Sequence, residues 1–187
     1  MTDLGARLQR EADAFPARVG YVVTDLSTGE RFGRNESEAF PTTSSIKLPV
    51  LTSFHSVVQL DEHDWDDEVA IDPRLSFGGS GVLQYLTLPG AESTIAVTEE
   101  QQGHETLHRY LPADPFSPGA LRVAEKSGAL PGISSGVAKR TRGDRRVAVA
   151  VLVDGADDTT ASVENESERL ISRMTRLACD ASLATDD

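Results

Sequence analysis

LRVAEKSGALPGISSGVAKRTRGDRRVAVAVLVDG, residues 121–155, contains three candidate strands separated by short connections. Apolar and β-branched residues are concentrated in three runs, which lie at Leu121 to Gly128, Ser134 to Arg140 and Arg145 to Asp154. Gly132 and Gly143 fall in the two connections and can supply the turns. Because short turns rather than long crossovers link these strands, we expect them to form an antiparallel sheet.

The rest of the chain adds two strands and several helices. Val19 to Asp25 and Glu30 to Arg34 are expected to form a hairpin around the turn Ser27-Thr28-Gly29. Helical spacing predicts four helices, and one short edge strand is indicated at Glu68 to Ile71; the helices lie at Thr2 to Phe15, Ser44 to Leu60, Thr98 to Leu111 and Val163 to Leu183. This order predicts an α+β fold in a single domain, residues 1–187, with an antiparallel five-stranded sheet flanked by N- and C-terminal helices.

The overall charge limits the partners that the chain can have. Acidic residues outnumber basic ones by 30 to 18, and the formal net charge is -12. Such a field repels phosphate backbones and anionic lipids, so neither nucleic acid nor a membrane is an expected partner. No stretch approaches the ~20 apolar residues of a membrane-spanning helix, and the first residues lack a signal-peptide core, which predicts a soluble, cytoplasmic protein. The single cysteine, Cys179, lies in the apolar stripe of the last predicted helix and is expected to be buried, without redox chemistry.

Lysine is scarce in this sequence. The chain has three lysines, Lys47, Lys126 and Lys139, and its other basic residues are arginines. An acid-rich, lysine-poor surface is the composition expected of a protein adapted to high salt, where dense carboxylates keep the surface hydrated. Two of the three lysines fall in patterns with chemical meaning.

The first pattern is Ser44-x-x-Lys47 at the head of an apolar run, in PTTSSIKLPVLTSF (residues 41–54). A serine needs a neighbouring base to act as a nucleophile, and positions three apart lie on one face of a helix. A helix beginning at Ser44 also leaves backbone N–H groups that stabilise developing negative charge. The alternative is structural: Thr42, Thr43 or Ser44 is an ordinary helix cap, and Lys47 extends from a core helix into water.

The second pattern is Lys126-Ser127-Gly128, in AEKSGAL at the end of a predicted strand. Glycine lets a ligand approach the backbone closely, and the lysine and serine offer a cation and a hydroxyl to a carboxylate. Taken alone, this run is equally an exposed strand end with a solvated lysine and a turn glycine.

Ser-x-x-Lys followed by Lys-[Ser/Thr]-Gly is the motif set of class A β-lactamases and penicillin-binding proteins, and the chain resembles that family. The likeness covers residues 19–51, 77–90, 101–112, 123–140 and 145–155. The resemblance implies a β-lactamase/transpeptidase-like fold, an acyl-enzyme formed on Ser44 with Lys47 as base or proton relay, and a β-lactam or related ester or amide as small-molecule substrate. It also implies that Lys126, Ser127 and Gly128 hold the substrate carboxylate, and that the N–H groups of Ser44 and Ala129 form the oxyanion hole. No metal or cofactor is implied.

Several parts of the family pattern are missing. The motif Ser-Asp-Asn is absent, because the only asparagines are Asn35 and Asn165 and neither has that setting. The loop glutamate that activates the deacylating water, four residues before an asparagine, is also absent: Arg31 and Ala161 occupy those positions. The resemblance implies that most of the helical lobe has been lost between about residues 95 and 97. The family often carries an arginine on the strand after Lys-Ser-Gly, and Ser134 and Ser135 occupy that region here.

Other polar residues have weaker signals. Asp61 and Glu62 belong to an acidic run that is typical of a solvated surface, and His55 is expected to have a structural role. His104 and His108 are four residues apart but have no third ligand nearby. His63 also lacks neighbouring residues of metal-ligand type, so a zinc site is not expected.

Three functions stay open from the sequence: a serine hydrolase, a catalytically impaired relative that binds its ligands as a pseudoenzyme, and a purely structural domain. The missing lobe also raises the possibility of a homo-oligomer formed through the face that it would leave exposed.

Overall fold

The computed structural model describes residues 2–60 and 121–183. The chain divides into two compact units, one formed by residues 1–49 with 103–187 and the other by residues 50–102. The strand expected at Glu68 to Ile71 and the helix expected at Thr98 to Leu111 lie outside the described residues. The single-domain assignment and the loss of the helical lobe near residues 95–97 therefore stay predictions.

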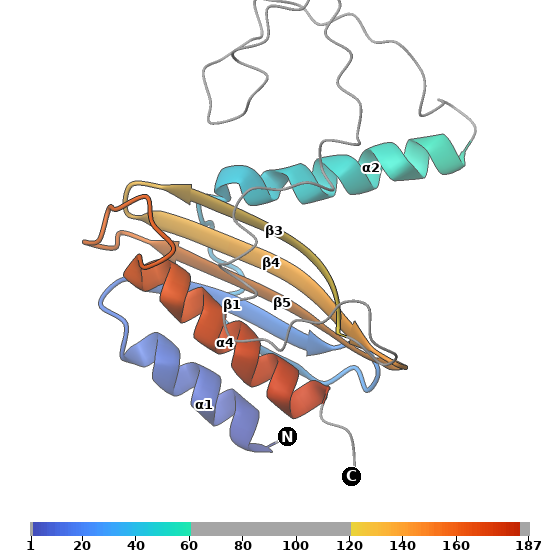
Figure 1. Cartoon of the computed structure of the whole chain (residues 1–187), viewed down its shortest axis with the longest axis horizontal. Coiled ribbons are helices and arrows are strands. Elements are labelled where there is room, and N and C mark those ends of the chain that lie inside the picture. The colour runs from blue at the N-terminus through green and yellow to red at the C-terminus, as the bar shows by residue number, and fades with distance from the viewer. Residues whose placement is uncertain (1, 61–120, 184–187) are drawn as a thin grey trace, which may run out of the picture. The chain divides into compact units, whose positions relative to one another are not determined.

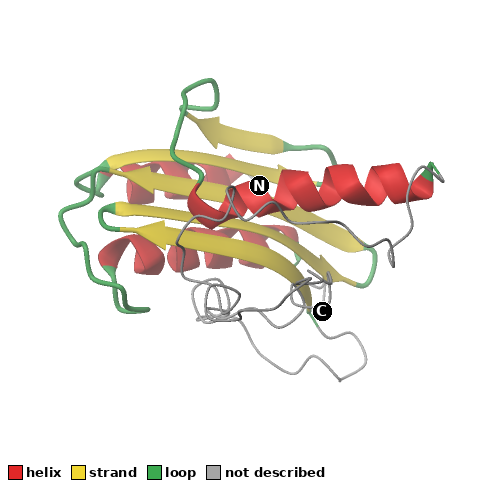
Figure 2. Cartoon of the chain, turned by 90° about the horizontal axis from the view of Figure 1, so that it is seen from above, coloured by secondary structure: helices red, strands yellow, loops and turns green. Residues whose placement is uncertain are grey.

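The first unit contains an antiparallel five-stranded sheet in the order β2-β1-β5-β4-β3 (Figures 1 and 2). Its strands are β1 (Arg18–Asp25), β2 (Arg31–Arg34), β3 (Arg122–Leu130), β4 (Ile133–Arg142) and β5 (Arg145–Asp154). Gly132 and Gly143, in the β3–β4 and β4–β5 turns, have φ values of 72° and 56°, a region that glycine enters without steric cost. The expected sheet and its turn glycines are confirmed.

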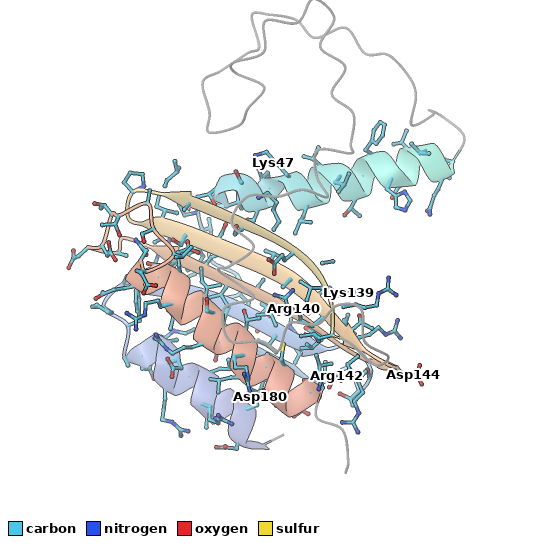
Figure 3. The ribbon with its side chains drawn as sticks, viewed as in Figure 1. Lys47, Lys139, Arg140, Arg142, Asp144 and Asp180 are labelled. Carbon is cyan, nitrogen blue, oxygen red and sulfur yellow. The ribbon has the colours of Figure 1, made fainter. Side chains whose placement is uncertain are left out.

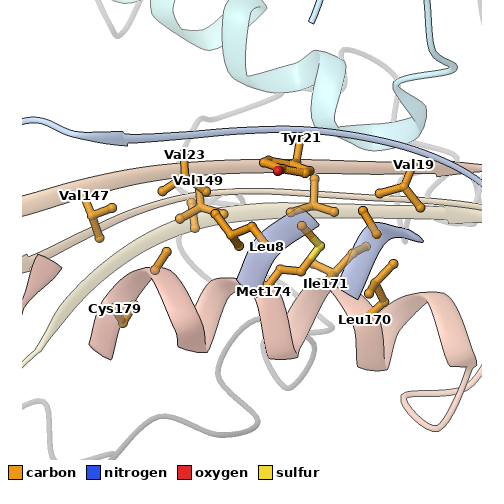
Figure 4. Close-up of a cluster of buried hydrophobic side chains, with 14 of the residues drawn as sticks. Leu8, Val19, Tyr21, Val23, Val147, Val149, Leu170, Ile171, Met174 and Cys179 are labelled. Carbon is orange, nitrogen blue, oxygen red and sulfur yellow. The ribbon is translucent and has the colours of Figure 1, made fainter. Parts of the chain in front are cut away.

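One face of the sheet forms the hydrophobic core, as the period-two alternation of β-strands requires. In β5, Val147, Val149, Val151 and Val153 are buried, whereas the residues between them are only half-buried. Figure 4 shows these strands packed on side chains from two helices, among them Leu8, Leu170 and Met174. The helices are α1 (Thr2–Asp13) and α4 (Glu166–Ser182), which lie side by side on this face (Figure 1). Cys179 of α4 is buried, as expected, and burial raises the pKa of its thiol to about 11.

The two helices are shorter than the sequence pattern predicted. The first ends at Asp13 rather than Phe15, and the last begins at Glu166 rather than Val163. Asn165 sets the second boundary, because its backbone is non-helical (φ −52°, ψ 136°) and its side chain accepts a hydrogen bond from the Ser167 N–H at 2.9 Å. Among the described residues, no helix has both the length and the apolar character needed to cross a bilayer.

Replacing Asn165 with alanine is expected to lower the free energy of unfolding by about 2 kcal/mol, because a helix cap is lost and two backbone carbonyls lose their donor. The Asn165 amide also donates to the carbonyls of Asp158 and Thr160 at 3.0 and 2.9 Å. Asn165→Asp keeps the cap acceptor but removes both donors, so it is expected to give an intermediate loss in urea denaturation. Equal stability of both variants and the parent would contradict this assignment.

The other described helix, α2 (Lys47–Gln59), follows a four-residue 3₁₀ turn, η1 (Thr43–Ile46). The expectation of a helix beginning at Ser44 is therefore wrong, and Pro49 explains why. An α-helix that began at Ser44 would need the N–H of residue 49 to bond the Ser45 carbonyl, and proline has no N–H. With Lys47 as the first α-helical residue, Pro49 falls in the first turn, where no such bond is required.

Candidate active site

Ser44 and Lys47 lie on either side of the η1–α2 boundary, and their side chains are in contact. The Lys47 Nζ donates to the Ser44 Oγ at 3.0 Å, so the three-residue spacing brings the amine to the hydroxyl even though the intervening turn is 3₁₀ rather than α. Ser44 is half-buried and Lys47 is exposed at the N-terminal end of α2, where Figure 3 labels it. The hydroxyl and its candidate base are thus both reachable from solvent.

Strand β3 packs directly against η1 at Gly128. A Cβ at this position would collide with the Thr43 Oγ1 and with the Ser44 backbone nitrogen, and the second atom cannot move without the turn. Glycine is therefore required for the strand to approach the serine this closely. The contact places the end of Lys126-Ser127-Gly128 beside Ser44, so the two sequence motifs meet in space.

Lys126 lies on the same face of β3 as Gly128, because side chains two residues apart share a face. Its ammonium donates to the Ser127 carbonyl at 2.7 Å. Burial lowers the pKa of Lys126, and the charge of Lys47 lowers it further, whereas Glu125 acts in the opposite direction. Because Gly128 lies against the Ser44 backbone nitrogen, Lys126 lies on the face of β3 that is turned toward η1.

Ser127 is placed differently from its neighbours. Its Cα is paired with Gly136 of β4, and the alternation of the strand directs its Cβ to the sheet face opposite that of Lys126 and Gly128. β3 is the last strand in the sheet of the described residues, so the backbone of Ser127 and of exposed Ala129 lies at an edge. A ligand bound along this edge would meet Lys126 from one face of the strand and Ser127 from the other.

Buried charge supports β3 from behind. On the core face, the Arg140 Nη2 donates to the Glu125 Oε2 at 2.6 Å, and these side chains are 0% and 6% exposed. Removal of one partner would leave the other charge buried and unpaired, which strongly destabilises a fold. The ion pair therefore favours the observed register of β3 and β4. Figure 3 labels Arg140 on β4, on the strand that separates β3 from β5.

Thr43, the residue before the serine, has a left-handed backbone that the sequence did not predict. Its φ is 48°, a conformation that costs a β-branched residue about 1–3 kcal/mol. The Thr42 side chain makes no capping hydrogen bond. Thr42 is therefore not the ordinary helix cap that the structural alternative proposed for it. The unusual φ turns the chain sharply just before Ser44.

The remaining polar candidates add no described group to the site. His55 is exposed on α2, and Asp61, Glu62, His63, His104 and His108 lie outside the described residues. Within residues 2–60 and 121–183, no cluster of three or more His, Cys, Asp or Glu side chains has the arrangement of a metal site.

The family model of the β-lactamase enzyme family matches this chain over residues 3–96 and 85–182. The chain belongs to this family. A search of curated proteins finds no match in sequence. The β-lactamase family model matches nearly the whole chain, including all the strands and helices described above.

Solved structures share the fold of this β-lactamase family member. A β-lactamase from Sphaerobacter thermophilus superimposes with a TM-score of 0.74 at 19% identity, covering 97% of each chain. The penicillin-binding protein PBP-A, in a variant that forms an acyl-enzyme complex with penicillin G, gives 0.72 at 13% identity, covering 97% of this chain and 96% of that one. A variant of the class A β-lactamase of the last common ancestor of Gram-negative bacteria, bound to a transition-state analogue, gives 0.70 at 16%, covering 96% and 98%. The expected β-lactamase/transpeptidase-like fold is confirmed.

Replacing Lys126 with methionine is expected to raise the free energy of unfolding near neutral pH. Because the folded-state pKa lies below the ordinary 10.5, the charged lysine costs stability at low and neutral pH, and this cost disappears as the pH rises toward 10.5. The advantage of the variant should therefore shrink between about pH 7 and about pH 10 in urea denaturation. Lys139→Met, at an exposed lysine of β4, is the control and should change stability by less than about 0.5 kcal/mol. A Lys126 variant less stable than the parent at neutral pH would contradict the assigned cause.

Proposed function

We propose that this protein is a serine hydrolase that is acylated on Ser44 by β-lactams or by related strained esters and amides. The observation that carries the proposal is the 3.0 Å hydrogen bond between the Lys47 Nζ and the Ser44 Oγ, beside a β3 strand that contacts Ser44 at Gly128 and carries Lys126 on the same face. Family membership gives this arrangement its chemical meaning, because related proteins include β-lactamases.

Acylation follows from these contacts. Lys47 accepts the proton of the Ser44 hydroxyl, and the Ser44 Oγ attacks the substrate carbonyl carbon. The oxyanion that forms accepts hydrogen bonds from the backbone N–H groups of Ser44 and Ala129, and such a pair can contribute about 3–4 kcal/mol of transition-state stabilisation. The carbon–nitrogen bond of an amide, or the carbon–oxygen bond of an ester, then breaks. The leaving atom takes up the proton that Lys47 accepted from Ser44, and the acyl group stays on Ser44.

The substrate carboxylate would bind along the edge of β3. Lys126 supplies the positive charge, and its partly buried position strengthens the attraction to an anion. Gly128 provides the space beside Ser44, and Ser127 offers its hydroxyl from the other side of the edge strand.

Turnover would be slow in this proposal. Hydrolysis of the acyl-enzyme needs an activated water, and the sequence has neither the family's loop glutamate nor its Ser-Asp-Asn motif. This observation favours the second candidate function, a β-lactam-binding pseudoenzyme that is acylated without being regenerated.

Two reagents distinguish these functions. A fluorescent penicillin that labels the protein stoichiometrically, with no hydrolysis of a chromogenic cephalosporin, would establish acylation without turnover. Hydrolysis of the cephalosporin at a constant rate would establish a hydrolase. Neither label nor hydrolysis, with the fold verified by circular dichroism at high salt, would overturn both and leave a structural domain.

A further inference from the structure

We propose that Ser135 is the positioning residue that holds the Ser44 nucleophile in place, by fixing the strained turn before it. This inference rests on the proposed function, because it assigns a role in Ser44 acylation to a residue on a different strand. Ser135 lies in β4 and is 0% exposed. Its Cα is paired with that of Gly128, so it occupies the sheet face on which η1 lies.

The Ser135 hydroxyl lies at the centre of a small hydrogen-bonded cluster. It is 2.7 Å from the Thr43 Oγ1, 2.9 Å from the Thr42 carbonyl oxygen and 3.3 Å from the Gly128 carbonyl oxygen. The Thr43 hydroxyl is itself 2.7 Å from the Thr42 carbonyl. The cluster therefore joins the turn before Ser44 to both strands that carry the site.

The number of hydroxyl hydrogens limits how this cluster is wired. Ser135 and Thr43 supply one hydrogen each. When the two hydroxyls bond each other, either Thr43 donates to Ser135 and Ser135 donates to the Thr42 or Gly128 carbonyl, or Ser135 donates to Thr43 and Thr43 donates to the Thr42 carbonyl. In each of these arrangements the Ser135 hydroxyl bonds the Thr43 hydroxyl, so loss of the Ser135 hydroxyl breaks this connection between turn and sheet.

That connection matters because Thr43 has a φ of 48°. A threonine leaves this conformation readily unless its surroundings hold it there. The residue that follows is Ser44, whose backbone nitrogen already lies against Gly128 with no room for a Cβ. Relaxation of the turn would move the Ser44 Oγ away from the edge of β3 and away from its productive geometry.

Ser135→Ala is expected to reduce the second-order rate of labelling by a fluorescent penicillin by about 10- to 100-fold, the effect of misplacing a reacting atom by about 1 Å. Ser134→Ala is the matched control. Ser134 is also buried, at 3% exposed, but the alternation of β4 places it on the opposite, core face, so its variant should label within about twofold of the parent.

A double-mutant cycle separates positioning from a general loss of stability. Thr43→Val removes the partner hydroxyl and keeps the side-chain shape, so the Thr43→Val, Ser135→Ala double variant should label little more slowly than the slower single variant. Additive losses would overturn the cluster as the cause.

Amide hydrogen exchange of residues 43–47 provides a readout that does not depend on activity. It should accelerate at least about tenfold in Ser135→Ala and stay unchanged in Ser134→Ala. A parent protein that is not labelled would overturn the proposed function, and the exchange would still decide the role of Ser135. Unchanged exchange in folded Ser135→Ala would overturn the positioning role, and where the parent is labelled an unchanged labelling rate would do so as well.

Discussion

Ser44→Ala is expected to abolish covalent labelling by a fluorescent penicillin, with a loss of at least about a thousandfold in the labelling rate, because the only atom that forms the acyl bond is removed. The stability of the protein should hardly change, since Ser44 is half-buried and its hydroxyl bonds only to the exposed Lys47 among the described residues. The measurement is in-gel fluorescence after incubation, combined with thermal unfolding of both proteins.

Ser53→Ala is the control for this prediction. Ser53 is an exposed serine in the same α2 region, and its loss should leave labelling unchanged. Full labelling of Ser44→Ala would mean that another residue is the nucleophile and would remove the basis of the proposed function.

Gly128→Ala is expected to reduce labelling by about 100-fold or more and to destabilise the fold by about 1–3 kcal/mol. A methyl group here would collide with the Thr43 side chain and the Ser44 backbone nitrogen, so β3 and η1 would have to separate. The separation would displace the nucleophile from the strand that is proposed to bind the substrate. Labelling kinetics and urea denaturation measure the two effects independently.

Gly33→Ala is the matched control on β2. The three atoms nearest to a Cβ at Gly33 all belong to the exposed side chain of Glu36, which can move aside. This variant should therefore keep the parent's labelling rate and most of its stability. If Gly128→Ala labelled as fast as Gly33→Ala, the close approach of β3 to Ser44 would have no functional importance.

Much of the fold was predictable because the local signals agree with the tertiary structure. Three apolar and β-branched runs, joined by short connections with Gly132 and Gly143, predicted an antiparallel sheet, and the structure has one. The helix boundaries were predicted less well. Pro49 and Asn165 mark the true beginnings of α2 and α4, and both signals were present in the sequence but were outweighed by the apolar periodicity that continues beyond them.

The candidate site was predictable only in part. Residues three apart, such as Ser44 and Lys47, can be paired from sequence alone, and their side chains are in contact. The left-handed backbone of Thr43 and the hydroxyl of Ser135 could not be inferred, because their importance depends on a contact between residues 92 positions apart. Strand alternation alone places Ser127 opposite Lys126, but which of the two lies on the face of η1 follows only from the tertiary structure.

The central claim is that Ser44 is an activated nucleophile beside the edge of β3. Peptide-mapping mass spectrometry after incubation with penicillin G tests it most directly. We expect a mass increase equal to one penicillin molecule, located on Ser44. An unmodified protein, or a modification located on any other residue, would contradict it.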